Sequence, residues 1–221
     1  MKLLMSALMK FACGLLMVGL LIFLPAGTLA YTCGWLFMGL LFVPMLIAGF
    51  VMFFKSPDFL AKRLDVKEKQ AAQKGVLAFS GLMFIVGFVV AGLDYRFGWS
   101  HVPQWVVIAA SAVFLAAYGL YGEVMRENAY LSRTIKVEEG QTVVDTGLYG
   151  VVRHPMYMAT MLLFMMIPLV LGSWYGLIAF AFYPAIIVVR LKDEEDLLTR
   201  ELPGYEDYKK KVKYRLIPFI W

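Results

Sequence analysis

Charge is absent from four long stretches of this 221-residue chain. No Asp, Glu, Lys or Arg occurs within residues 11–54, 75–93, 97–122 or 154–189. With 61% hydrophobic and 17% charged residues overall, the composition excludes an ordinary soluble domain. The first and last stretches are each long enough for two membrane helices, and the middle two for one each. The missing charge therefore predicts a polytopic integral membrane protein.

Six membrane helices fit these stretches. We predict them at about residues 6–27, 35–54, 76–93, 104–122, 155–171 and 174–190. The last two are the shortest, so we expect neighbouring helices to cover them in part. The predicted fold class is all-α, with a helical hairpin near the C-terminus.

Cysteine, histidine and nucleotide-binding motifs are scarce or missing. Cys13, Cys33, His101 and His154 have no metal-ligand spacing, so we predict no metal site. No Gly-x-Gly-x-x-Gly follows a predicted strand, no P-loop pattern occurs, and there is no βαβ series. These absences exclude a soluble-type Rossmann cofactor domain.

Basic residues are almost absent from one side of the predicted topology. Of the 21 Lys and Arg residues, all except Arg96 fall at the N-terminal end or within residues 55–74, 123–153 and 190–221. The positive-inside rule makes this side cytoplasmic and places both termini there. Lys10 interrupts the apolar start, so we expect a retained helix and no signal peptide. The net charge of +5 then reflects topology and attraction to anionic lipid, with no signal for nucleic acid.

The last uncharged stretch must fold back on itself. As one helix, residues 154–189 would run roughly 54 Å, against a hydrocarbon core of about 30 Å. Gly172-Ser173 near its middle predicts a turn between two antiparallel helices. The clusters at residues 153–157 and 190–195 then return to the same membrane face, on helices about 8–10 Å apart.

The chain divides into two regions. Residues 1–122 hold the first four helices and a cytoplasmic connector at 55–74, in which Ser56-Pro57 predicts the start of an interfacial helix over 57–72. Residues 123–221 form the second region.

The second region comprises a cytoplasmic loop, the hairpin 155–190 and a tail. Alternation at Ile135 and Val137, with a Glu-Gly turn after them, predicts a small β-hairpin or extended loop over 132–144. Long loops rich in hydrogen-bonding groups often bind ligands.

Each polar cluster also has a structural interpretation. Arg153 and His154 fit an interfacial anchor for their helix, and Arg190 and Glu194 fit a pair at i and i+4. Residues 193–196 fit a solvated helix end. Because the two clusters face one another across the predicted hairpin, we favour a functional site.

The stretch Asn128 to Trp221 resembles the isoprenylcysteine carboxyl methyltransferase family and, more distantly, phospholipid N-methyltransferases. The matching elements are Thr146-Gly147-Leu148-Tyr149, Arg153-His154-Pro155-Met156-Tyr157, Arg190 with Glu194-Glu195, Pro203-Gly204-Tyr205-Glu206-Asp207-Tyr208 and Arg215-Leu216-Ile217-Pro218.

The resemblance implies S-adenosylmethionine as methyl donor, bound in a cytoplasmic site. Carried over position by position, the donor would contact Gln141, Thr142, Val143, Val144, Tyr149, His154, Pro155, Met156, Tyr157 and Glu194. Arg190 would be the catalytic residue that faces the acceptor. The partners implied are membrane lipids and a lipophilic or prenylated substrate.

The residue chemistry agrees with this resemblance. Glu194 suits the donor's ammonium or ribose hydroxyls, and Tyr149 or Tyr157 suits its adenine or sulfonium. A carboxylate acceptor is already ionised and needs no general base, while Arg190 can orient it bidentately. We therefore predict carboxyl O-methylation of an isoprenylcysteine-like acceptor.

Three alternatives remain at this point. One is a phospholipid or amine N-methyltransferase. Another is an NADPH-dependent, sterol-reductase-like oxidoreductase, although such reductases are usually longer and have Asn where Pro155-Met156 stands here. The third is a small transporter or scaffold, but transporters usually carry ionisable residues near the bilayer midplane and the uncharged stretches have none.

Overall fold

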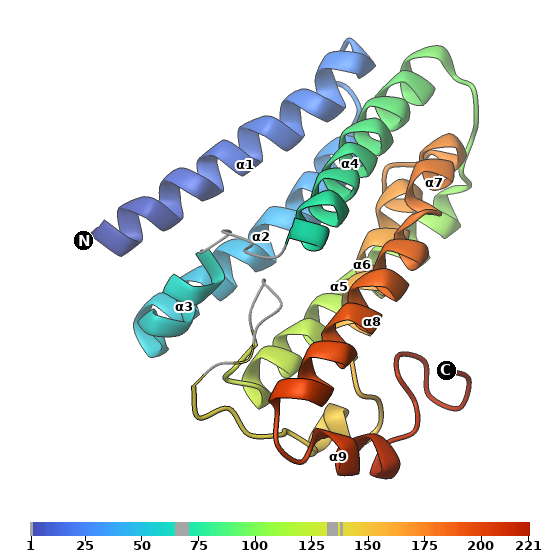
Figure 1. Cartoon of the computed structure of the whole chain (residues 1–221). Helices are drawn as coiled ribbons and strands as arrows, with labels where there is room; N and C mark the ends of the chain where they lie inside the picture. Colours follow the sequence, from blue (N-terminus) through green and yellow to red (C-terminus); the bar gives the residue numbers. More distant parts are fainter. Residues whose placement is uncertain (1, 65–70, 132–136, 138) are drawn as a thin grey trace.

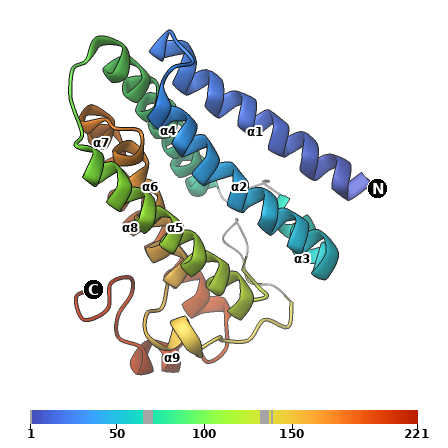
Figure 2. The same ribbon diagram turned by 180° about the vertical axis from the view of Figure 1, so that it is seen from behind.

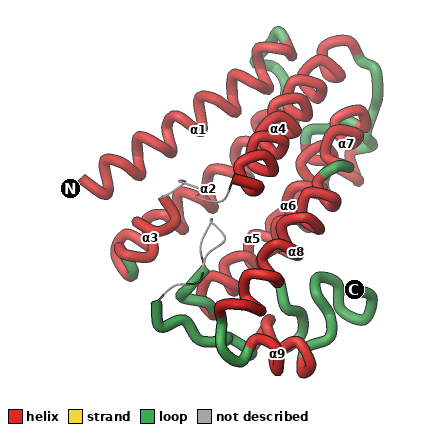
Figure 3. The backbone as a smooth tube through the Cα atoms, viewed as in Figure 1, coloured by secondary structure: helices red, strands yellow, loops and turns green. Residues whose placement is uncertain are grey.

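The computed structural model describes residues 2–64, 71–131, 137 and 139–221, and in these ranges every regular element is a helix (Figure 1, Figure 3). The elements are α1 Lys2–Ala26, α2 Thr32–Lys55, α3 Pro57–Leu64, α4 Ala71–Phe97, α5 Gln104–Glu127, the 3-10 turn η1 Gly147–Gly150, α6 Pro155–Val170, α7 Trp174–Phe180, α8 Tyr183–Glu201 and α9 Tyr205–Lys211. The predicted all-α class is confirmed.

Five helical segments of the described chain are long and apolar enough to cross a membrane. They are Leu3–Ala26, Thr32–Lys55, Gly75–Phe97, Gln104–Glu127 and Trp174–Glu201. The predicted fifth helix, α6, is a shorter apolar helix of 16 residues, about 24 Å long. It packs against α5, α7 and α8, so its neighbours cover it as expected.

The hairpin turn forms where the sequence predicts it. Gly172 has φ +74°, a left-handed conformation that a residue without Cβ adopts at no steric cost. Ser173 then caps α7 by accepting a hydrogen bond from the backbone amide of Gly176 at 2.9 Å. α6 and α8 consequently contact one another along the hairpin (Figure 1).

The helix predicted at 174–190 is interrupted between Phe180 and Tyr183. Pro184, in the first turn of α8, lacks the amide hydrogen that would bond to the Phe180 carbonyl. The second arm of the hairpin is therefore two helices, α7 and α8. α8 continues to Glu201, beyond the predicted end.

The connector and the loop differ in part from prediction. α3 begins at Pro57 as expected, but its described part ends at Leu64 and Ala71 already belongs to α4. Residues 65–70, within the predicted helix, lie outside the described residues, as do 132–136 and 138 within the predicted hairpin. Residues 139–140 form the expected Glu-Gly turn, and the described residues 141–144 after it are not part of a strand.

A buried carboxylate holds together the end of the molecule opposite α9, where the connection from α4 to α5 passes near α7 (Figure 2). Asp94 is 1% exposed and accepts hydrogen bonds from the Ser100 amide (2.7 Å), the Ser100 hydroxyl (2.6 Å) and the Ser173 hydroxyl (2.5 Å). Nearby, the Tyr31 hydroxyl donates to the Leu171 carbonyl. These contacts join the end of α4 to the turn between α6 and α7.

We expect Asp94→Ala to lower the free energy of unfolding by about 2–4 kcal/mol, because the buried Ser173 hydroxyl and the half-buried amide and hydroxyl of Ser100 lose their acceptor. Thermal unfolding in detergent measures the effect. Ser111→Ala is the matched control, since its hydroxyl bonds the Val107 carbonyl of its own helix and no other described residue. Equal loss in both variants would contradict a joining role for Asp94.

Candidate functional site

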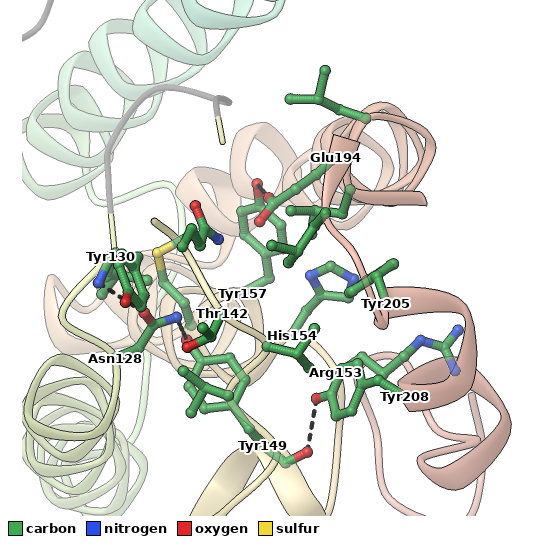
Figure 4. A pocket seen from close by; sticks show the side chains of 18 of the residues that line it. Asn128, Tyr130, Thr142, Tyr149, Arg153, His154, Tyr157, Glu194, Tyr205 and Tyr208 are labelled. Atoms are coloured by element: carbon green, nitrogen blue, oxygen red, sulfur yellow. Dashed lines mark hydrogen bonds between the residues drawn. The ribbon is translucent and has the colours of Figure 1, made fainter. Parts of the chain in front are cut away.

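A pocket opens at the end of the helical bundle where α5 ends, α6 begins and α8 meets α9 (Figure 4). It encloses about 830 Å³ of space when its open mouth is included. The lining residues are Asn128, Tyr130, Leu131, Gln141, Thr142, Val143, Val144, Tyr149, Arg153, His154, Met156, Tyr157, Arg190, Glu194, Leu197, Leu198, Leu202, Tyr205 and Tyr208.

Glu195 organises the base of this site. It is 5% exposed and accepts from Arg153 Nε at 2.7 Å and Arg215 Nε at 2.9 Å, with His154 Nε2 at 3.3 Å. Arg153 Nη1 also donates to the carbonyls of Val212 (2.7 Å) and Lys213 (3.0 Å). A buried carboxylate with several charged hydrogen-bond partners is a stable arrangement, and removing any partner is costly. Glu195 is therefore not part of a solvated helix end.

The C-terminal tail is bonded to the start of α6 through the backbone. The amide of Arg153 donates to the Tyr214 carbonyl, and that of His154 to the Arg215 carbonyl, both at 2.9 Å. His154 is the N-cap residue of α6, with Pro155 in the first turn as predicted. The tail thus fixes the direction in which α6 leaves the pocket.

A second contact crosses the hairpin inside the pocket. The Tyr157 hydroxyl on α6 donates to Glu194 Oε2 on α8 at 2.5 Å, across 37 residues of sequence. The His154 ring stacks on Tyr157 with centroids 5.7 Å apart. Arg190, one turn before Glu194 on α8, lines the same pocket as His154. The predicted fold-back is therefore present.

Tyr149 forms the wall between the loop and the tail. Its hydroxyl accepts from Asn128 Nδ2 at 2.9 Å, and its carbonyl accepts from the Tyr208 hydroxyl at 2.7 Å. Gly147, before it, has φ +51°, and a Cβ there would overlap the Glu127 carboxylate. Burial raises the pKa of Tyr149, so its hydroxyl stays protonated at neutral pH.

Nearly all residues predicted for the site lie around this pocket. Those that line it are Gln141, Thr142, Val143, Val144, Tyr149, His154, Met156, Tyr157, Arg190 and Glu194. Pro155 does not line it and is buried within α6. Among the described residues, no group of three His, Cys, Asp or Glu side chains is arranged to hold a metal ion.

Sequence reasoning missed the contribution of α9. Tyr205 and Tyr208 line the pocket three residues apart, on one face of α9. Gly204, with φ +85°, makes the turn that starts this helix. The signal was the Pro-Gly-Tyr-Glu-Asp-Tyr element at 203–208, which the sequence analysis used for the resemblance but not for the site.

The same part of the chain matches a known family. Residues 105–200 match the model of the Isoprenylcysteine carboxyl methyltransferase (ICMT) family. This range contains nearly all of α5, the loop, α6, α7 and nearly all of α8, and it ends before α9. The resemblance is confirmed over these residues and supports a membrane methyltransferase.

Two curated sterol reductases are also similar to this chain. The Delta(14)-sterol reductase of Methylotuvimicrobium alcaliphilum is 22% identical over 205 residues, which is 83% of this chain and 48% of that protein. The Delta(14)-sterol reductase TM7SF2 of Mus musculus is 30% identical over 91 residues, 40% of this chain and 22% of that protein. The chain thus spans less than half the length of these relatives.

We expect Glu195→Gln to lower the free energy of unfolding by about 3–5 kcal/mol, because Arg153 stays buried without its charge partner. Glu201→Gln, exposed at the end of the same helix, is the control and should change little. Thermal unfolding in detergent compares the two. Similar midpoints would refute the role given to Glu195.

Proposed function

We propose that this chain is an S-adenosylmethionine-dependent methyltransferase that methylates the carboxylate of a lipophilic, isoprenylcysteine-like acceptor. The observation that carries the proposal is the meeting of Glu194, Tyr157 and Arg190 in one pocket, built from the segment that matches the family. The proposed orientation places this pocket and both termini on the cytoplasmic side, following the basic residues.

The lining residues fit the chemical groups of the donor. Glu194 offers a carboxylate to an ammonium or to ribose hydroxyls, and the rings of His154 and Tyr157 offer aromatic faces to a cation or a purine. The backbone amides of Met156 and Tyr157 precede the first bond of the α6 ladder, which runs from the Met158 amide to the His154 carbonyl, and they suit a carboxylate. When bound, the donor supplies a methyl group on a sulfonium.

We assign the contact with the acceptor to Arg190. It lies on α8 one turn closer to the apolar part of the helix than Glu194, as expected for a group that meets a substrate from the bilayer. Its guanidinium can bind a carboxylate through two parallel hydrogen bonds and align one oxygen with the methyl group. That oxygen would form the new O–C bond as the S–C bond of the donor breaks, which would leave the donor as a thioether. No side chain has to remove a proton.

A second candidate function is an NADPH-dependent reductase. The two sterol reductases among the similar proteins favour it. The pocket favours the methyl donor, because NADPH carries several phosphate charges and the Lys and Arg side chains among the lining residues are Arg153 and Arg190. Arg153 is already bonded to Glu195. The lining also includes Glu194, which would repel phosphate.

Calorimetry with purified protein tests the donor. We expect S-adenosylmethionine to bind and NADPH not to bind, and Glu194→Ala to weaken binding at least about tenfold through the lost charged hydrogen bonds. Asp196→Ala, an exposed carboxylate two residues on, is the matched control and should bind as wild type. A heat of binding measured with NADPH but not with S-adenosylmethionine would favour the reductase instead.

The acceptor prediction concerns Arg190. We expect Arg190→Lys to reduce kcat/KM for methyl transfer to a prenylcysteine about a hundredfold, because an ammonium cannot bind a carboxylate bidentately. The Kd for S-adenosylmethionine should stay the same. Transfer of labelled methyl into an alkali-labile ester measures the reaction. Alkali-stable label would identify N-methylation and refute the carboxylate acceptor.

A further inference from the structure

Tyr205 carries a buried hydroxyl that no described residue hydrogen-bonds. The residue is 3% exposed, and it lines the pocket from the first turn of α9 (Figure 4). Its oxygen has no hydrogen-bond partner among the described residues. Buried polar groups are nearly always satisfied, so an unsatisfied hydroxyl on a pocket wall points to a ligand.

The neighbouring tyrosine shows the contrast. Tyr208 packs its ring against Tyr205, with centroids 5.7 Å apart, and both belong to a cluster with Leu202 and Val212. The Tyr208 hydroxyl is bonded to the Tyr149 carbonyl at 2.7 Å. Packing in this cluster therefore accounts for the burial of both rings, and the bond to the Tyr149 carbonyl accounts for the Tyr208 hydroxyl. It leaves the Tyr205 hydroxyl without a structural role.

The surroundings make Tyr205 a hydrogen-bond donor. Burial, together with the nearby carboxylates of Glu195 and Glu194, raises the pKa of Tyr205 well above its usual range. The hydroxyl consequently keeps its proton. It can offer that proton to an acceptor atom of a molecule in the pocket.

We propose that Tyr205 is a further donor-binding residue, whose hydroxyl donates a hydrogen bond to an oxygen or nitrogen acceptor of bound S-adenosylmethionine. This inference rests on the proposed function. It adds α9, which lies beyond the segment that matches the family, to the wall that recognises the donor. The product S-adenosylhomocysteine has the same acceptor atoms and should make the same bond.

Tyr205→Phe removes one oxygen and leaves the ring. We expect the Kd for S-adenosylmethionine and that for S-adenosylhomocysteine to rise by the same factor, about three- to tenfold. The unfolding midpoint of the ligand-free protein should stay equal or rise, because an unsatisfied buried group is lost. Tyr208→Phe should lower that midpoint. Tyr95→Phe, at the far end of the molecule, controls for loss of a tyrosine hydroxyl.

The outcomes separate this inference from the proposed function. If wild type binds both ligands and Tyr205→Phe binds them equally well, the inference is overturned and the proposed function stands. A lower midpoint in ligand-free Tyr205→Phe with unchanged Kd values would assign the hydroxyl a structural role and also overturn it. If wild type binds neither ligand, the proposed function fails and the inference fails with it.

Discussion

The buried carboxylate of Glu195 is the constraint on which the rest of the site depends. It draws together Arg153 and His154 at the start of α6 and Arg215 in the tail, so two separate segments meet on one face of α8. Without this charge, the buried guanidinium of Arg153 would keep its two carbonyl acceptors but lose its carboxylate partner. Because Glu195 faces the protein, its neighbour Glu194 is rotated by about 100° around the helix and faces the pocket.

The opposite end of the molecule is fixed in a similar way. Asp94 binds the Ser173 hydroxyl beside the hairpin turn, while Glu195 binds the two arginines at the other end. Between them lie apolar helices whose contacts are not directional. Two buried carboxylates therefore set how the α6–α8 hairpin sits in the bundle, and the Tyr157–Glu194 contact follows from that placement.

The sequence predicts those features that follow from the spacing of charged residues and from the length of membrane that a helix can cross. An uncharged stretch too long for one membrane crossing has to turn. At Gly172 the left-handed backbone conformation of this turn carries no steric penalty. The resemblance gave most of the pocket lining. Two adjacent carboxylates look alike in sequence, however, and only the packing of Arg153, His154 and Arg215 against α8 decides that Glu195 is the buried one. α9 was missed because seven residues after Gly204 are too few for a clear periodic pattern.

The central claim of this account is that the returning hairpin builds a binding site for a methyl donor at one end of the bundle. An experimental structure with S-adenosylhomocysteine present tests it most directly. The account predicts the ligand between Glu194 and Tyr149, in contact with α6, α8 and α9. Ligand density elsewhere on the molecule, or Arg190 and His154 at opposite ends of the bundle, would contradict it.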